Sequence, residues 1–338
     1  MLEKINLKKE ESKDEKSKVA IVGGGPSGIS CAYFLAQNNI SSTIIEKENF
    51  LGGIMMYGIP DFRLDKKVVQ DSIDFAISNH NINIRYNTKY INADNKEDLD
   101  SKLTYISMQD LKKQGYEYIF ISIGKEKSVM LNIDGIEDEN VYSAIQVLRL
   151  SNEEAIKCFK DCKVVTVGGG NVAMDSSRFV LKDGEAKNST IIYRRRREDM
   201  PASPQEIEDA ENEKVDFYYQ KNIIKIERYN KDILEKNSGE EIDTSNINYN
   251  KDVLLLHLDD GHKVLTNKLI LAIGARVNSD YFEKEFFEDD KIKINNDNES
   301  ILENVFFGGD IINNDQTIAQ AIKSGKDAAE KIIARITE

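Results

Sequence analysis

Short apolar runs that end in glycine recur along this chain and predict buried strands. The runs at 18–22 and 163–167 each lead into a glycine-rich turn, followed by stretches with helical spacing at 29–37 and 174–181. An apolar β-branched run, a glycine turn and a helix together form the opening of a β-α-β unit. Two such openings predict an α/β fold with two Rossmann-like dinucleotide-binding domains and mostly parallel sheets.

Other segments complete this pattern. Apolar runs at 118–123, 269–273 and 305–307 each stop at glycine, as expected for strands that end at the ligand edge of a sheet. The polar stretch 229–251 predicts a surface loop or hairpin inside the second half. The apolar spacing over 317–337 predicts an amphipathic C-terminal helix.

Composition and charge restrict the function classes. A chain of 338 residues, with 40% hydrophobic and 31% charged residues, is typical of a soluble globular protein of two domains. The net charge of −13 argues against a nucleic-acid partner. No apolar run approaches the roughly 18 residues that span a membrane, and the Lys- and Glu-rich start has no signal-peptide core. We expect a cytoplasmic protein with a charged leader at 1–16.

The first glycine turn has the residues and the setting of a dinucleotide site. In Gly23-x-Gly25-x-x-Gly28, the glycines permit a tight turn, a close backbone approach to a pyrophosphate, and close helix packing. The following helix offers unpaired N–H groups to phosphate. The strand 42–45 ends at Glu46, about 20 residues downstream, where a carboxylate accepts a hydrogen bond from a ribose hydroxyl.

The second turn, Gly168-x-Gly170-x-x-Ala173, uses the same device with alanine in third place. Its next strand, 189–193, ends in four arginines instead of an acid. Guanidinium groups bind the 2′-phosphate of NADPH, whereas a carboxylate there favours NADH. We therefore expect NADPH, with NADH possible, and Arg194 and Arg195 as the phosphate contacts.

These residues resemble the small (beta) chain of bacterial glutamate synthase and its relatives in the pyridine nucleotide-disulfide oxidoreductase superfamily. The resemblance runs from about Lys18 to the C-terminus. Its specific motifs are the segment 51–66, which reads LGGIMMYGIPDFRLDK, and Tyr193-Arg194-Arg195 with Met200-Pro201-Ala202 and Glu206 after it. More general markers are Ile273-Gly274-Ala275 and Gly308-Gly309-Asp310.

The resemblance implies an FAD domain at 17–150 and 280–338 and a nicotinamide-nucleotide domain at 151–279, with hinges near 144–151 and 274–280. In the FAD domain, Asp310 would accept from the ribityl chain, and the start of the last helix would face the flavin. The expected FAD-binding residues are Gly23, Gly25, Pro26, Ser27, Gly28, Glu46, Lys47, Gly52, Gly53, Tyr57, Gly58, Ile59, Gly124, Gly309, Asp310, Gln316, Thr317 and Ala319. The expected NADP-binding residues are Gly168, Gly170, Asn171, Val172, Ala173, Arg194, Arg195 and Gly274.

The cysteines mark a departure from the family. The glutamate synthase small chain carries a cysteine-rich N-terminal segment with iron–sulfur clusters, whereas no cysteine precedes Cys31 here. We expect no iron–sulfur cluster in this chain. Cys158 and Cys162 are spaced C-x3-C, which is neither a redox pair of the superfamily's disulfide branch nor a complete metal site. Thioredoxin or glutathione reductase activity is therefore disfavoured.

The expected reaction is hydride transfer from NADPH to FAD, with electrons leaving to a larger synthase-like subunit or a ferredoxin-type protein. Because the cofactors carry this chemistry, no side chain is assigned a catalytic role, including His80, His257 and His262. One alternative is a free-standing reductase for ferredoxin, quinone or a small acceptor. Another is a non-catalytic flavin-binding module.

Overall fold

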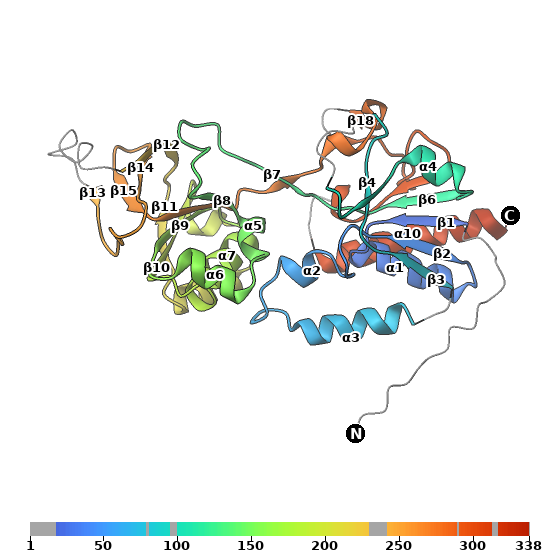
Figure 1. The fold of residues 1–338 in the computed structure, drawn as a ribbon, viewed down its shortest axis with the longest axis horizontal. Helices are drawn as coiled ribbons and strands as arrows, with labels where there is room; N and C mark the ends of the chain where they lie inside the picture. Colours follow the sequence, from blue (N-terminus) through green and yellow to red (C-terminus); the bar gives the residue numbers. More distant parts are fainter. Residues whose placement is uncertain are drawn as a thin grey trace, which may run out of the picture. The chain divides into compact units, whose positions relative to one another are not determined.

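A computed structural model describes residues 18–78, 81–94, 100–229, 242–288, 291–312 and 317–337. The chain divides into two compact units (Figure 1). The first unit comprises Met1–Gly53, Lys67–Lys125 and Asn278–Glu338, and the second comprises Ile54–Lys66 and Glu126–Val277. The chain therefore passes between the units at four points.

The division differs from the expected domain boundaries in two places. The first unit ends at Lys125 instead of about 150, because the strand at 141–143 pairs with a strand of the second unit. In addition, Ile54–Lys66 packs within the second unit although both of its neighbours in sequence belong to the first. The return to the first unit at Asn278 lies within two residues of the expected boundary.

The first unit is built on a parallel five-stranded sheet with the order β20-β6-β1-β2-β3. The strands are β1 (Val19–Val22), β2 (Ser42–Ile45), β3 (Ile82–Arg85), β6 (Tyr118–Ile121) and β20 (Val305–Phe307). The helices are α1 (Pro26–Gln37), α3 (Lys66–Ala76), α4 (Met108–Lys113) and α10 (Ile318–Thr337).

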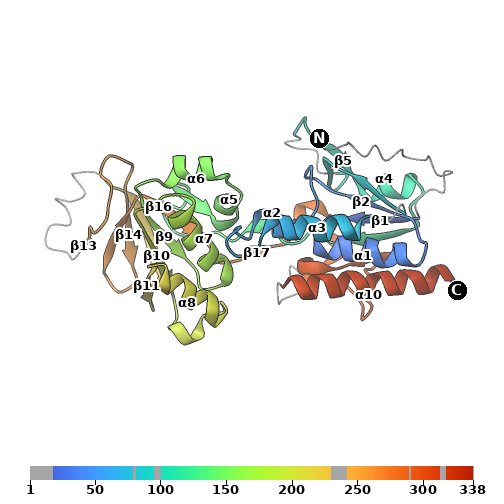
Figure 2. The same cartoon turned by 90° about the horizontal axis from the view of Figure 1, so that it is seen from below.

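Helices α1 and α10 lie side by side along this sheet (Figure 2). Their close approach requires Gly325, because a Cβ there would lie 2.0 Å from the Ser27 carbonyl oxygen. The Ser30 hydroxyl also donates to the Ile322 carbonyl of α10 at 2.8 Å. The C-terminal helix thereby fixes the first turn of α1.

The second unit repeats the plan with the order β11-β10-β9-β16-β8, again all parallel. Its strands are β8 (Val141–Ser143), β9 (Lys163–Val167), β10 (Asn188–Tyr193), β11 (Asp216–Tyr219) and β16 (Lys268–Leu271). Its helices are α2 (Ile54–Tyr57), α5 (Ala144–Leu148), α6 (Asn152–Phe159), α7 (Asn171–Lys182) and α8 (Pro204–Asn212).

A four-stranded sheet packs against the five-stranded sheet of the second unit, through a core that includes Val165 of β9 and Leu254 and Leu256 of the four-stranded sheet. Its strands, in order, are β12 (Ile223–Arg228), β14 (Leu254–Leu258), β15 (Lys263–Thr266) and β13 (Ile242–Asp243). Three strand pairs complete the described strands: β4 (Thr88–Tyr90) with β5 (Thr104–Ile106), β7 (Lys127–Ser128) with β17 (Ala275–Arg276), and β18 (Phe287–Glu288) with β19 (Lys291–Ile292).

The strand predictions are confirmed to within one or two residues, and so is the C-terminal helix. In each five-stranded sheet the strand order reverses beside the strand that leads into the glycine turn, β1 in one and β9 in the other. Ligands of open α/β sheets bind at this switch point, beyond the carboxyl ends of the strands. Both glycine turns therefore lie where a dinucleotide site is expected.

Candidate functional site

The first glycine turn has the shape that each glycine was expected to impose. Gly23 adopts φ +99°, and a Cβ there would lie 2.7 Å from the Ser122 carbonyl oxygen. A Cβ on Gly28 would lie 2.0 Å from the Gly23 carbonyl oxygen, so only glycine fits. Gly25 differs, because a Cβ built on it meets no atom within 4 Å. The turn is therefore tightly packed at Gly23 and Gly28 and open at Gly25.

The second turn reproduces this arrangement. Gly168 adopts φ +146°, and a Cβ there would lie 2.3 Å from the Ala272 carbonyl oxygen. Gly170, like Gly25, has open space where a Cβ would be. Ala173, in the third position, is fully buried, so here the helix leaves room for a methyl group. The Asn171 Oδ1 accepts from the Ser203 N–H at 2.9 Å, which joins the turn to α8.

The two helices that follow these turns lack side-chain caps. Gly25 and Gly170 are the N-cap residues of α1 and α7, and neither can supply a cap hydrogen bond. Helices α4, α5, α6 and α8, by contrast, each begin at a serine whose hydroxyl accepts from the helix backbone. Unpaired N–H groups at a helix start attract phosphate. The two turns therefore fit the pyrophosphate groups of two dinucleotides.

Glu46 is placed at the first turn as the motif predicts. Its Oε2 accepts from the Gly24 N–H at 2.7 Å, and its Oε1 accepts from the Glu48 N–H at 2.8 Å. Burial raises the pKa of this carboxyl. Each carboxylate oxygen keeps a further lone pair, so a ribose hydroxyl can still donate to Glu46. Lys47, the next residue, is half-buried.

The loop at Gly52 and Gly53 closes over the first turn. The Gly52 N–H donates to the Gly24 carbonyl oxygen at 2.8 Å. A Cβ on Gly53 would lie 3.1 Å from the Gly25 Cα. The remaining motif residues expected near FAD, Tyr57, Gly58 and Ile59, lie in the stretch that packs within the second unit.

Ser324, in the second turn of α10, contacts the first glycine turn and the loop at Gly309. The Ser324 hydroxyl lies 3.0 Å from the Ser27 hydroxyl and accepts from the Gly309 N–H at 2.7 Å. Asp310 follows Gly309, and burial raises the pKa of its carboxyl. Within the described ranges, this carboxylate has no hydrogen-bond partner. An unpaired, half-buried carboxylate beside the turn fits a polyhydroxyl ligand.

The remaining residues named from the sequence lie at several places in the two units. Gly124 and Gly274 follow the inner strands β6 and β16 and adopt φ +72° and +109°, and a Cβ built on either would meet no atom of the described residues within 4 Å. Thr317 precedes α10, where its hydroxyl accepts from the Gln320 N–H at 3.2 Å, and Ala319 is exposed. Gln316 and His80 lie outside the described residues. Val172 is partly exposed at the start of α7, and Pro26 is the first residue of α1.

The four arginines after β10 are not equivalent. Arg197 forms a bidentate pair with Glu211, with both N–O distances 2.8 Å, and Arg196 lies 3.3 Å from Glu198. Arg194 and Arg195 are exposed, and neither guanidinium has an ion-pair partner in the described part of the chain. Arg194 and Arg195 therefore remain available to an anionic ligand.

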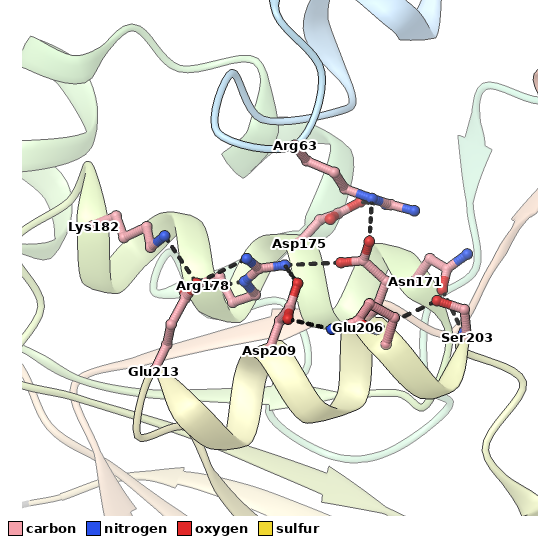
Figure 3. Close-up of polar contacts among 10 residues, drawn as sticks. Arg63, Asn171, Asp175, Arg178, Lys182, Ser203, Glu206, Asp209 and Glu213 are labelled. Carbon is pink, nitrogen blue, oxygen red and sulfur yellow. Dashed lines mark hydrogen bonds and ion pairs between the residues drawn. The ribbon is translucent and has the colours of Figure 1, made fainter.

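A charged cluster in the second unit was not predicted as a site (Figure 3). Arg63, from the YGIP segment, bonds through Nη1 to the Asp175 Oδ2 at 2.5 Å and through Nε to the Glu206 Oε1 at 2.7 Å. Asp175 lies on α7, and Glu206 on α8. The two specific motifs of the sequence therefore meet at one ion pair. The signal in the sequence was the acid at position 175, inside the stretch 174–181 that was predicted to be helical.

Arg178 completes the cluster without contacting Asp175 directly. It bonds to Glu206 at 2.8 Å and to both carboxylate oxygens of Glu213. Burial raises the pKa of Asp175 to about 6, although Arg63 opposes the shift. The Asp175 Oδ1 is buried without a hydrogen-bond partner among the residues described.

The two described histidines, His257 and His262, and the three cysteines lie outside these turns. His257 contacts Glu227 at 2.6 Å, and His262 lies beside Asp260 in the turn between β14 and β15. Cys31 is buried in α1, where burial raises the pKa of its thiol. Cys31, Cys158 and Cys162 form no disulfide. Among the residues described, no helix is both long and apolar enough to cross a membrane.

Comparison with known proteins places this geometry in a family. The family model described as pyridine nucleotide-disulphide oxidoreductase matches residues 17–328. YgfK of Escherichia coli (strain K12) is 29% identical over 325 residues, which cover 94% of this chain and 29% of YgfK. The glutamate synthase [NADPH] small chain of the same organism is 27% identical over 342 residues, covering 95% of this chain and 69% of that one.

The fold itself matches a solved structure. Thioredoxin reductase from T. acidophilum superposes with a TM-score of 0.67 at 16% identity, covering 95% of this chain and 99% of that one. This likeness shows two Rossmann-like domains and no specific activity. The family resemblance expected from the motifs is confirmed. This chain belongs to the pyridine nucleotide-disulphide oxidoreductase family, whose oxidoreductases use FAD and a nicotinamide dinucleotide.

Proposed function

We propose that this protein is an NADPH-dependent FAD oxidoreductase that delivers electrons to a partner subunit or redox protein. The first unit binds FAD through the turn at 23–28, Glu46, the loop at 52–53 and Asp310. The second unit binds NADPH through the turn at 168–173 and the arginines after β10. The pair of uncapped helix starts carries this proposal, since each offers backbone N–H groups to one pyrophosphate.

The choice of NADPH rests on the unequal arginines. Arg196 and Arg197 are paired with acids, whereas Arg194 and Arg195, directly after β10, have no acidic partner among the residues that the structure describes. A phosphate on the ribose 2′ position accepts charge-assisted hydrogen bonds from such groups. A ribose hydroxyl gains much less from them, so NADH should bind more weakly.

The chemistry that the bound cofactors supply is hydride transfer from the nicotinamide to the flavin. The protein's own contribution is to bind the two cofactors, to orient them and to shield them from water. The carboxylates of Glu46 and Asp310 would hold the sugar and ribityl hydroxyls, and the backbone N–H groups of α1 and α7 would hold the phosphates. No side chain is required to transfer a proton in this step.

The relatives support the proposed role as an electron-input component. The chain spans less than a third of YgfK and about two thirds of the glutamate synthase small chain, which is named as one chain of a larger enzyme. Among the described residues, no redox cysteine pair is available to pass electrons onward. The electrons are therefore expected to leave to another protein.

The direct test is anaerobic titration of the FAD-loaded protein with NADPH and, separately, with NADH. We expect rapid bleaching of the flavin absorbance by NADPH and slower bleaching by NADH. Bound FAD that neither nucleotide bleaches would overturn the proposal for this chain and favour a non-catalytic flavin module. Copurification of a larger chain from the native source would distinguish an input subunit from a free-standing reductase.

A further inference from the structure

Residues Ile54–Lys66, which we call the docking segment, follow directly from the loop that closes the first glycine turn. Gly53 contacts that turn, and the next residue already belongs to the second unit. The segment is closed on itself by Lys66, whose Nζ donates to the carbonyl oxygens of Met55, at 2.9 Å, and of Ile59. It is therefore a compact loop with its own internal bonds.

Two aromatic side chains attach the docking segment to the second unit. The Tyr57 ring lies 3.8 Å from the Arg149 guanidinium carbon, just after α5. The Phe62 ring lies 4.7 Å from the Arg178 guanidinium carbon and 4.4 Å from the Lys182 Nζ, both on α7. Cation–π contacts of this kind favour one orientation of the ring.

Arg63 attaches the segment through two ion pairs. Its ion pair with Asp175 joins the segment to α7, the helix that begins at the second glycine turn, and its ion pair with Glu206 joins it to α8 (Figure 3). The Asp175 side chain is only 2% exposed, and Arg63 is its one ion-pair partner within the described ranges. An ionised carboxylate this deeply buried requires a cation. The nearby Arg178 is already bonded to Glu206 and Glu213.

We propose that Arg63 is a positioning residue for hydride transfer. Through it, one stretch of chain is fixed at Gly53 to the first glycine turn and at Asp175 to the helix of the second. The inference rests on the proposed function, since these turns hold FAD and NADPH there. Hydride transfer requires the reacting atoms within about 3–3.5 Å, so loosening this link slows the transfer step more than it weakens binding.

The test compares Arg63→Gln, Arg63→Lys and Asp175→Asn with the wild type, all as FAD-loaded full-length protein. Arg228→Ala is the matched control, because Arg228 also pairs with two acids of the second unit, Asp138 and Glu139, but lies on β12. Three quantities are measured: the limiting rate of flavin reduction at saturating NADPH, the Kd for NADP+, and hydrogen exchange of the amides in residues 54–66.

For Arg63→Gln we expect the limiting rate to fall about tenfold or more, with the Kd for NADP+ changed less than threefold. Amide exchange over residues 54–66 should become faster. Arg63→Lys should recover part of the rate. Lysine keeps the positive charge, but it lacks the guanidinium group that pairs with Asp175 and Glu206 through two different nitrogens. Arg228→Ala should match the wild type in all three measurements.

Unpaired Asp175 can prevent Arg63→Gln from folding, and the double variant Arg63→Gln/Asp175→Asn, which removes both charges, then replaces it. A limiting rate within twofold of the wild type, in a folded variant, overturns the proposal. Unchanged amide exchange overturns the docking on which it rests. Failure of NADPH to reduce the wild-type flavin refutes the proposed function instead, and amide exchange then still decides whether Arg63 holds the segment.

Discussion

At the scale of single residues, four consecutive arginines have two different roles. Arg196 and Arg197 are held by acids, whereas Arg194 and Arg195 project from the end of β10 with no acid beside them in the described part of the chain. All four have the same charge, and Arg194 and Arg195 were expected to be the phosphate contacts because they come first after the strand at 189–193. The ion pairs of the folded chain separate them.

Replacing Arg194 or Arg195 with alanine should therefore weaken NADPH binding selectively. Loss of one charge-assisted hydrogen bond to phosphate corresponds to about 1.5–3 kcal/mol, or roughly tenfold to a hundredfold in Kd. The Kd for NADH should change less than threefold. Isothermal titration with both nucleotides measures this, and Arg196→Ala, which removes an already paired arginine, is the control. Equal losses for NADPH and NADH would contradict a 2′-phosphate contact.

Asp175 gives a pH-dependent prediction at the same scale. Burial raises its pKa from 3.8 to about 6, so the folded chain binds this proton more tightly than the unfolded chain. Ionisation of Asp175 therefore destabilises the fold. As the pH rises from about 4 to about 6, the free energy of unfolding of the wild type relative to Asp175→Asn should fall by up to about 3 kcal/mol. Above about pH 6 the difference should stay constant.

Urea unfolding of both proteins at several pH values measures this difference, in which other titrating groups cancel. A difference that does not vary with pH would show that Asp175 titrates equally in the folded and unfolded chains.

The glycines of both turns and the acid Glu46 could be foreseen, because their roles follow from local backbone demands. Asp175 could not, since its partner Arg63 is remote in sequence.

At the scale of elements, two glycines of the first turn, Gly28 and Gly25, serve different purposes. Gly28 touches the Gly23 carbonyl, whereas Gly25 faces open space in an extended conformation, φ −75°, that any residue can adopt. Gly28 allows α1 to pack closely on β1. Gly25 leaves the approach to the uncapped start of α1 open.

A pair of alanine substitutions distinguishes these roles. Gly28→Ala should destabilise the apoprotein by several kcal/mol or prevent folding, because its Cβ cannot be accommodated. Gly25→Ala should leave the unfolding free energy of the apoprotein within about 0.5 kcal/mol but weaken FAD binding at least tenfold. Fluorescence titration with FAD and urea unfolding of the apoprotein measure both effects. Full FAD affinity in Gly25→Ala would show that no phosphate lies against this turn.

The elements themselves were largely predictable, because glycine-terminated apolar runs report buried parallel strands directly. Helices α1 and α7 begin three residues before the predicted helical stretches, because their first turns contain few apolar residues and gave no periodic signal. The expected domain boundary near 150 was less reliable. Strand β8 and helix α5 are local features, but their membership of the second sheet depends on pairing with β16, which is remote in sequence.

At the scale of the whole molecule, the chain passes between the units four times, whereas the sequence predicted two passages. The extra pair flanks the docking segment, whose motif was recognised from the sequence while its place in the fold was not. The resemblance assigned this segment to the flavin. The contacts of Tyr57, Phe62 and Arg63 show that its side chains also complete the packing of the second unit.

The second unit should therefore be incomplete without residues 54–66. In a fragment of residues 126–277 alone, Asp175 loses its cation, and Arg178 and Lys182 lose the cover of Phe62. Appending residues 54–66 through a flexible linker should raise the stability of this fragment by about 2 kcal/mol, or roughly 4–8 °C in Tm for a unit of this size. Calorimetry of both fragments measures the gain. The same appended segment carrying Phe62→Ala and Arg63→Ala controls for the linker and should confer no gain. An equal Tm for all three fragments would show that the segment contributes no stability to the second unit, and the link between the two glycine turns would then lack its anchor on α7.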